Sequence, residues 1–203
     1  METWKISAQH SARRTRFGIA CAAVLALGWL ALPTPAHADD GHDVPQNVPA
    51  NLQVPAGNRV FFDGHARGVQ IYTCTATGWS FVAPAAILFD ELEEWGLHRG
   101  DGEERVAIHF TGPTWQANDG STVTGKKVAS ANAPSATAIP WLLLQAVVTT
   151  TGAHGGDTLT DTTYVQRLYT TGGVAPASGC DAAHVGAYAG VPYTADYFFY
   201  KAE

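Results

Sequence analysis

The sequence has few basic residues, few cysteines and none of the short motifs that mark most nucleotide-binding enzymes. Its 203 residues contain 12 lysines and arginines against 18 aspartates and glutamates, which gives a formal net charge of −6 with neutral histidines. Such an acidic chain is repelled by nucleic acid and by anionic membrane surfaces. We therefore expect no nucleic-acid partner.

Sequence motifs for cofactors, metals and nucleophiles are also missing. No G-x-G-x-x-G follows an expected strand and there is no P-loop, so we expect no nucleotide cofactor. No G-x-S-x-G elbow is present. The histidines after residue 38 show neither H-x-H nor H-E-x-x-H spacing, so no metal site is expected from spacing, although distant strands could assemble one as in cupin-like barrels. Carboxylates are plentiful enough for a glycosidase pair, but nothing selects two of them.

The first 38 residues have the pattern of a cleavable export signal. Arg13, Arg14 and Arg16 precede an apolar run over 17–32, and the segment ends in an A-x-A pattern at 36–38. The apolar run is shorter than the ~20 residues that a membrane span needs. We therefore expect a secreted or periplasmic protein with no membrane span after signal cleavage.

The remaining sequence predicts one domain preceded by an arm. Residues 39–55 are polar and broken by prolines, which indicates an extended N-terminal arm. Residues 56–203 are long enough for a single domain with its own core. The expected organisation is a signal peptide over 1–38, an arm over 39–55 and one β domain over 56–203.

Two of the three cysteines lie beyond the signal segment. Cys74 and Cys180 are expected to form one disulfide, because paired cysteines in an exported chain are normally oxidised. The alternative is two free buried thiols. Neither cysteine lies in a C-x-x-C pattern, which argues against redox catalysis.

Short β-branched and aromatic runs, separated by Gly, Pro and Asx turns, predict about nine strands. This pattern is typical of an all-β antiparallel sandwich or barrel, with a jelly-roll or Greek-key order expected. Pro84 is expected to end a strand that begins near Trp79, and 85–95 could form a short helix. The run Leu142–Val148 is expected to be a central strand buried on both faces, with a buried helix as the alternative.

The stretch 108–127 combines turn residues with chemically versatile side chains. His109, Trp115, Asp119 and Lys126 lie within eighteen residues, around a Gly-Pro break and an Asn-Asp-Gly turn. Histidine can act as a base, a ligand or a hydrogen-bond donor, and tryptophan offers a stacking face. We predict that these four residues border a ligand site. The structural alternative is that the stretch is a hairpin that organises the sheet.

Motifs spread over most of the chain resemble one family. They include GVQIYTCT (68–75), HFTGPTW (109–115), IPWLLL (139–144), YVQR (164–167) and PYTADY (192–197). Together they resemble the secreted domain of unknown function 3455 (DUF3455) of bacteria and filamentous fungi. The resemblance implies an exported protein and supplies no activity. The acidic segment 91–105 departs from the family pattern.

These observations favour an exported β-sandwich protein that binds a small molecule or glycan or acts at the cell surface, without chemistry of its own. The alternative is a secreted hydrolase or metal-dependent enzyme with a site around His109. The two hypotheses differ in whether His109 meets further catalytic groups in one pocket.

Overall fold

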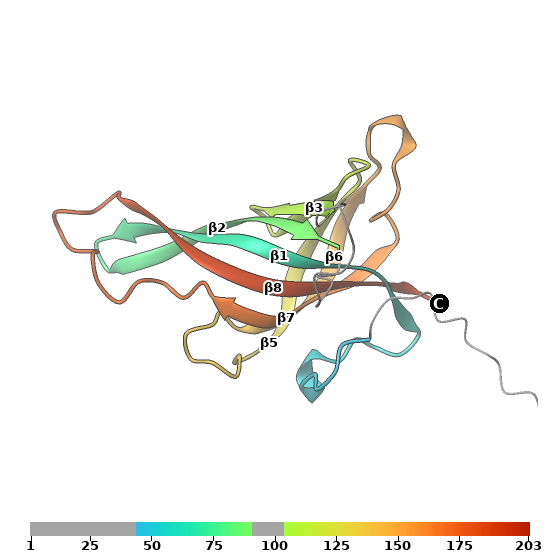
Figure 1. Ribbon diagram of the computed structural model, residues 1–203, viewed down its shortest axis with the longest axis horizontal. Coiled ribbons are helices and arrows are strands. Elements are labelled where there is room, and N and C mark those ends of the chain that lie inside the picture. Colours follow the sequence, from blue (N-terminus) through green and yellow to red (C-terminus); the bar gives the residue numbers. More distant parts are fainter. Residues whose placement is uncertain (1–43, 91–103) are drawn as a thin grey trace, which may run out of the picture. The chain divides into compact units, whose positions relative to one another are not determined.

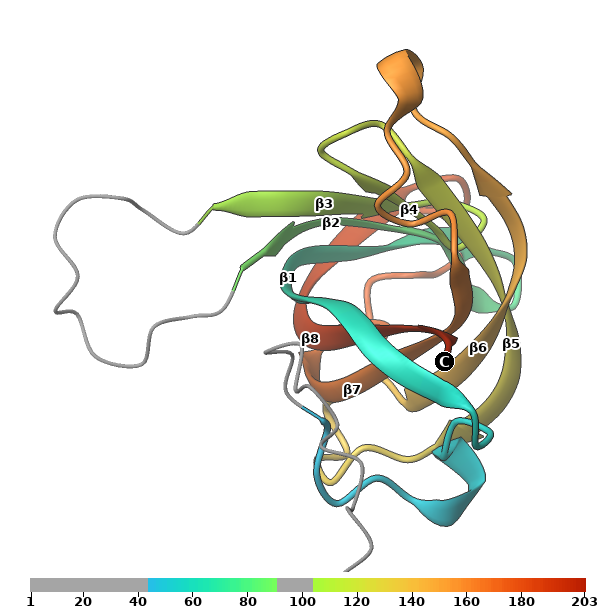
Figure 2. The same ribbon diagram turned by 90° about the vertical axis from the view of Figure 1, so that its right-hand side faces the viewer.

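The computed structural model of the protein describes residues 44–90 and 104–203. Eight strands in these residues form a closed antiparallel barrel, which Figure 1 shows from the side and Figure 2 shows turned by a right angle. Each strand pairs with the next along the chain, and β8 pairs with β1 to close the barrel. The strands are β1 (Asn58–Thr75), β2 (Gly78–Phe89), β3 (Arg105–Phe110), β4 (Thr114–Ala117), β5 (Thr122–Ala131), β6 (Trp141–Thr150), β7 (Thr162–Gly172) and β8 (Tyr188–Ala202).

The predicted all-β antiparallel class is confirmed, while the strand order is up-and-down and not the expected Greek-key order. The structure has eight strands where about nine were expected, and residues 58–75 form one continuous strand, β1. Gly68 lies within this strand. A Cβ atom at Gly68 would lie 2.1 Å from the carbonyl oxygen of Ala85, so glycine lets β2 approach β1 closely.

Pro84 does not end a strand as expected, because β2 continues through it to Phe89. Pro84 pairs with Gln70 of β1, whereas the pairing of β2 with β3 begins only at Ala86. Pro84 therefore lies where β2 has a neighbour on one side only, a position at which the missing N–H is tolerated. The first part of the expected helix over 85–95 is strand, and the rest lies outside the described residues.

The apolar run of β6 is buried only in its first half. Leu143 and Leu144 are buried, but Val147 and Val148 are each more than half exposed. The pairing of β6 with β7 ends at Gln145, so the later residues lose cover on one side. The expectation of burial on both faces to Val148 is therefore wrong for its second half, while the strand itself is confirmed.

The interior of the barrel is filled by aromatic and aliphatic side chains. Trp115, Tyr197 and Phe199 are among the largest side chains that are fully buried. Phe199 meets the ring of Trp115 edge-on, with centroids 5.7 Å apart. This interior core also contains Leu88, Val123, Leu144 and Val165.

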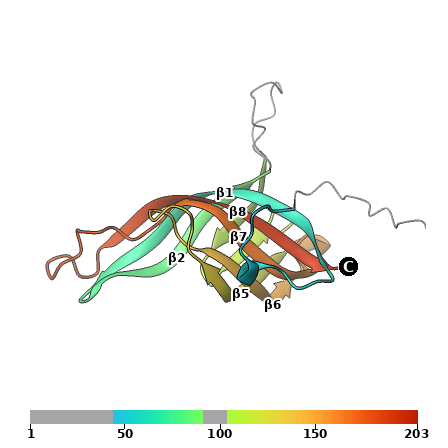
Figure 3. The ribbon, with the colours of Figure 1, turned by 90° about the horizontal axis from the view of Figure 1, so that it is seen from below.

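A second core lies outside the barrel wall, beneath the segment that precedes β1. Leu52, in the short helix η1 (Ala50–Leu52), is fully buried against Leu168 and Phe198 of the wall. The side chain of Gln166 donates a hydrogen bond to the carbonyl of Leu52 at 2.6 Å. Figure 3 shows η1 beside β5. Strands β6, β7 and β8 are therefore covered on both faces here.

The predicted disulfide joins Cys74, near the end of β1, to Cys180 in the connection between β7 and β8. It fastens this connection beside the β1–β2 hairpin, and the indole of Trp79 donates to the carbonyl of Ser178 at 3.0 Å. The expectation of one disulfide is confirmed.

The predicted signal segment 1–38 and the acidic segment 91–103 lie outside the described residues. Within 44–90 and 104–203, no helix is long and apolar enough to cross a membrane.

Candidate functional site

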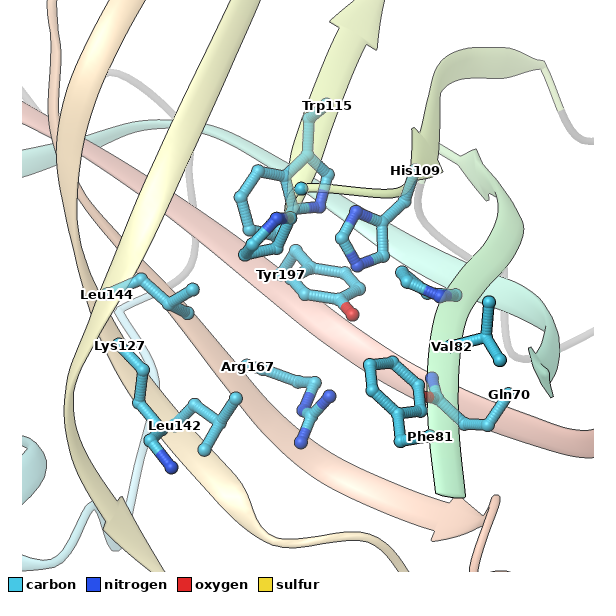
Figure 4. A pocket seen from close by; sticks show the side chains of 13 residues that line it. Gln70, Phe81, Val82, His109, Trp115, Lys127, Leu142, Leu144, Arg167 and Tyr197 are labelled. Atoms are coloured by element: carbon cyan, nitrogen blue, oxygen red, sulfur yellow. The ribbon is translucent and has the colours of Figure 1, made fainter. Parts of the chain in front are cut away.

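A cavity of about 140 Å³ lies inside one end of the barrel. All eight strands contribute to its wall, and Figure 4 shows the side chains that converge on it. The lining residues are Gln70, Phe81, Val82, Pro84, His109, Gly112, Pro113, Trp115, Lys127, Leu142, Leu144, Arg167 and Tyr197. Eight strands give a barrel interior that side chains can just fill or that can hold one small ligand. Here the core fills the barrel only in part.

An aromatic cluster forms part of the cavity wall. His109 and Trp115 are cross-strand partners on β3 and β4, and their rings stack with centroids 4.4 Å apart and planes 6° from parallel. Tyr197 of β8 packs against both rings, at 5.1 and 5.3 Å. The cluster joins strands from opposite ends of the chain and fixes the indole in place.

His109 is buried and electrically neutral. Its Nδ1 lies 2.9 Å from the carbonyl oxygen of Thr114, which can only accept, so Nδ1 carries the proton. Burial lowers the pKa of His109 to about 3, against the opposing effect of the Thr114 hydrogen bond. A group with this pKa is a weak base at neutral pH.

The neutral state of His109 predicts a specific loss of stability in acid. The unfolded chain binds a proton on this residue near pH 6.5, whereas the folded chain does so only near pH 3. Stability is therefore lost as the pH falls below about 6.5, by on the order of 3 kcal/mol between pH 6.5 and pH 4. Urea unfolding at several pH values measures this loss.

The matched variant is His109→Phe, which keeps an aromatic ring against Trp115 and has no titratable group. It is expected to be less stable than the parent at neutral pH, since the bond to Thr114 is lost. The difference in unfolding free energy between the parent and the variant should shrink as the pH falls towards 4, because only the parent loses stability through protonation at this position. If the unfolding free energies of the two proteins change with pH in parallel, His109 is not a buried neutral imidazole.

Arg167 places a positive charge in the cavity. Its Nε and Nη2 atoms donate to the carbonyl oxygen of Pro140 at 3.2 and 2.7 Å, which holds the guanidinium against the start of β6. In Figure 4 the guanidinium lies in the middle of the ring of side chains, below Tyr197. Burial raises the pKa of Tyr197, and the charge of Arg167 acts in the opposite direction.

Two buried donors of the cavity wall have no hydrogen-bond acceptor among the described residues. They are the Nε2 of Gln70 and the Nε1 of Trp115, in side chains only 2% and 1% exposed. A buried donor without a partner costs about 1–3 kcal/mol, so nearly all such groups in proteins are satisfied. Both residues line the cavity, and a molecule with acceptor atoms there would satisfy them.

The structure separates the four residues predicted to border a ligand site. His109 and Trp115 line the cavity, whereas Asp119 and Lys126 are not among its lining residues. Since Pro113 at the cavity precedes β4 and the turn that carries Asp119 follows β4, this turn lies at the opposite end of the strand from the cavity.

Asp119 holds the β4–β5 turn to the connection between β6 and β7. Its carboxylate accepts hydrogen bonds from the Ser121 hydroxyl at 2.6 Å and from the Thr158 amide at 2.8 Å. Desolvation opposes ionisation here, but these hydrogen bonds prevail and keep the pKa of Asp119 below its usual value. The contacts of this carboxylate are those of a structural turn residue.

Lys127, the neighbour of Lys126, lines the cavity instead. Val123 and Gly125 are buried, so alternation along β5 places Lys127 on the same face of the strand as these two residues, with its side chain exposed. Arg167 carried a similar signal, because it follows the interior residue Val165 by two positions. On both β5 and β7, a basic residue therefore follows a buried interior residue by two positions, where the pattern of the strand predicts an apolar side chain.

None of the thirteen residues that line the cavity is acidic. Among the described residues, no group of three or more His, Cys, Asp or Glu side chains lies close enough together to hold a metal ion. Besides apolar side chains, the cavity lining contains the cations Arg167 and Lys127, the buried donors of Gln70 and Trp115, the hydroxyl of Tyr197 and the neutral ring of His109.

A model of the protein family described as "Protein of unknown function (DUF3455)" matches residues 55–201. This match spans all eight strands of the barrel and every residue that lines the cavity. No curated protein and no solved structure matches the chain.

Proposed function

The chain belongs to the DUF3455 family, and we propose that it binds a small organic molecule in the cavity at the end of its barrel. The observation that carries the proposal is the pair of buried donors, Gln70 Nε2 and Trp115 Nε1, that line the cavity without an acceptor. An apolar pocket with a few converging polar groups is the usual form of a ligand site.

The size of the cavity limits the ligand to about one ring. Its volume of about 140 Å³ is close to that of an engineered cavity of about 150 Å³ that holds benzene in another protein. Trp115 offers no open face to a sugar, since His109 stacks on it and its side chain is 1% exposed. These features favour a small ring compound over a glycan.

An enzyme with its site around His109 has less support. A general base works best when its pKa lies near the working pH, and burial lowers the pKa of His109 to about 3. The lining residues include no serine, cysteine or carboxylate that His109 could activate or pair with. Binding without chemistry is therefore the function that we propose.

We also propose that the protein acts outside the cytoplasm after cleavage behind Ala38. The basic, apolar and A-x-A segments of residues 13–38 support export. The bond between Cys74 and Cys180 supports it as well, because disulfides persist in oxidising compartments.

Filling the cavity tests the proposed function. Leu142 lines the cavity, and Leu142→Trp places a larger side chain in it. Benzoate, benzamide and cyclohexanone serve as one-ring probes that carry acceptor atoms. We expect at least one of them to bind the parent and raise its melting temperature, and none to do so for Leu142→Trp. Calorimetric titration and thermal melting measure the two effects.

The control is Val147→Trp, on the same strand at a position that is 53% exposed and outside the cavity lining. It should bind the probes as the parent does. Equal binding to Leu142→Trp, or no binding of any probe to the parent, would overturn the proposed function. Because overpacking can cost about 1–3 kcal/mol, the melting temperatures without probe are compared first.

A further inference from the structure

We infer that the cavity selects a small organic anion, a carboxylate carried on a single apolar ring. This inference rests on the proposed function and adds the chemical class of the ligand. It follows from the charge of the polar groups in the cavity, from the way Arg167 is held, and from the apolar walls opposite.

The polar side chains that line the cavity include two cations. Arg167 and Lys127 supply positive charge, and Gln70 and Trp115 add N–H groups that lack an acceptor. Among the described residues, no acidic side chain lines the cavity to neutralise this charge, although the whole chain has a net charge of −6. A negatively charged acceptor is the complement of such a set.

Arg167 is held in place before a ligand arrives. Two of its nitrogens bind the carbonyl of Pro140, and the nearby hydroxyl of Thr170 donates to the carbonyl of Ile139 at 2.5 Å. Both of these bonds go to one neutral backbone carbonyl, that of Pro140, which leaves the charge of Arg167 unneutralised. A planar guanidinium binds a carboxylate with directed, charge-assisted bonds.

A β-bulge just beyond Arg167 adds to this fixation. Tyr169 has a left-handed backbone with φ of 48°, at the shift in register between Leu168 and Thr171 of β7. Such a conformation costs about 1–3 kcal/mol for a residue other than glycine. The hydroxyl of Tyr169 donates to the carbonyl of Gln46 at 2.7 Å, which holds the bulge in place. Bulges commonly redirect side chains beside functional sites.

Apolar groups make up most of the remaining wall and set the shape of the ligand body. They are the side chains of Phe81, Val82, Pro84, Pro113, Leu142 and Leu144. These residues offer no hydrogen bonds from their side chains, so the part of the ligand that meets them is apolar. The volume of about 140 Å³ corresponds to about one ring.

The test compares benzoate with benzamide, which has nearly the same shape and no charge, by calorimetric titration of the purified disulfide-bonded protein. We expect benzoate to bind at least tenfold more tightly. Arg167→Met should bring the two affinities close together, and Lys127→Met should reduce their ratio several-fold. Lys126→Met is the matched control, since Lys126 is the adjacent lysine outside the cavity lining, and it should leave the ratio unchanged.

The possible outcomes separate the anion inference from the proposed function. If benzamide binds the parent as tightly as benzoate, the anion inference fails while the proposed function stands. If neither compound binds at millimolar concentration, the anion inference fails, and the proposed function fails with it when cyclohexanone does not bind either. If benzoate is preferred but the preference survives in both Arg167→Met and Lys127→Met, these cations do not select the ligand. The comparison in the parent needs no variant, so it holds even if Arg167→Met folds poorly.

Discussion

Leu143→Asp is expected to prevent the protein from folding. The side chain of Leu143 is 6% exposed and belongs to the core outside the barrel wall, with Leu52, Leu168 and Phe198. A carboxylate there would be desolvated among apolar side chains without a partner, at a cost of several kcal/mol. Since domains are stable by only about 5–15 kcal/mol, one such cost removes most of the stability. Far-UV circular dichroism and soluble yield measure the result.

Val147→Asp is the control on the same strand. Val147 is 53% exposed, so the same carboxylate would be solvated there. This variant should fold and melt within a few degrees of the parent. If Leu143→Asp melts like Val147→Asp, the core outside the barrel wall contributes little to stability, and the position of η1 over it would have to be reconsidered.

Removing the disulfide is expected to lower the stability of the protein nearly as much as Leu143→Asp does. Cys74 and Cys180 are 106 positions apart, and a loop of about 100 residues corresponds to about 4.7 kcal/mol in the chain-entropy treatment. The double variant Cys74→Ala, Cys180→Ala should therefore lose about 4–5 kcal/mol of unfolding free energy. Denaturant unfolding of the oxidised parent and the variant gives the difference.

Reduction provides the control for this prediction. Adding dithiothreitol to the parent should reproduce most of the loss, and it should leave the double variant unchanged. If the double variant loses unfolding free energy but the reduced parent does not, packing of Cys74, which is 2% exposed, matters more than the cross-link. Equal stability of the oxidised parent and the variant would contradict the expected contribution of the bond.

Local patterns predicted the strands and turns well. Along β1, Gln70, Tyr72 and Cys74 lie at alternate positions and all three are buried, as the period of a strand predicts. The Asn-Asp-Gly turn at 118–120 connects β4 and β5 as expected. These features depend on neighbours a few residues apart, so they can be read from the sequence.

Closure of the barrel could not be predicted in this way. It depends on pairing between β1 and β8, in which Val60 lies opposite Tyr200. The continuous path of β1 through Gly68, and of β2 through Pro84, depends on which strand lies alongside each residue. Single-strand patterns do not contain that information, so the sequence predicts that Pro84 ends a strand, which it does not.

The candidate site was predicted in part. His109 and Trp115 lie close together in the sequence and do line the cavity. Arg167, Tyr197 and Gln70 come from β7, β8 and β1, and only the closed barrel brings them to the same place. The ligand role of His109, Trp115, Asp119 and Lys126 stays a prediction, with Asp119 and Lys126 outside the cavity.

Two buried indole N–H groups lack an acceptor among the described residues, and they provide the most direct test of ligand binding in the cavity. Trp115 Nε1 belongs to a residue that lines the cavity, whereas Trp141 Nε1 belongs to the core outside the barrel wall. Both give separate indole signals in a proton–nitrogen correlation spectrum, assigned with Trp115→Phe and Trp141→Phe. A benzoate titration is followed through these two signals.

A ligand in the cavity should move the Trp115 signal downfield in a saturable manner, as its N–H gains an acceptor, and leave the Trp141 signal in place. If Trp115 stays fixed at saturating benzoate, or if both signals move together, the cavity is not the binding site.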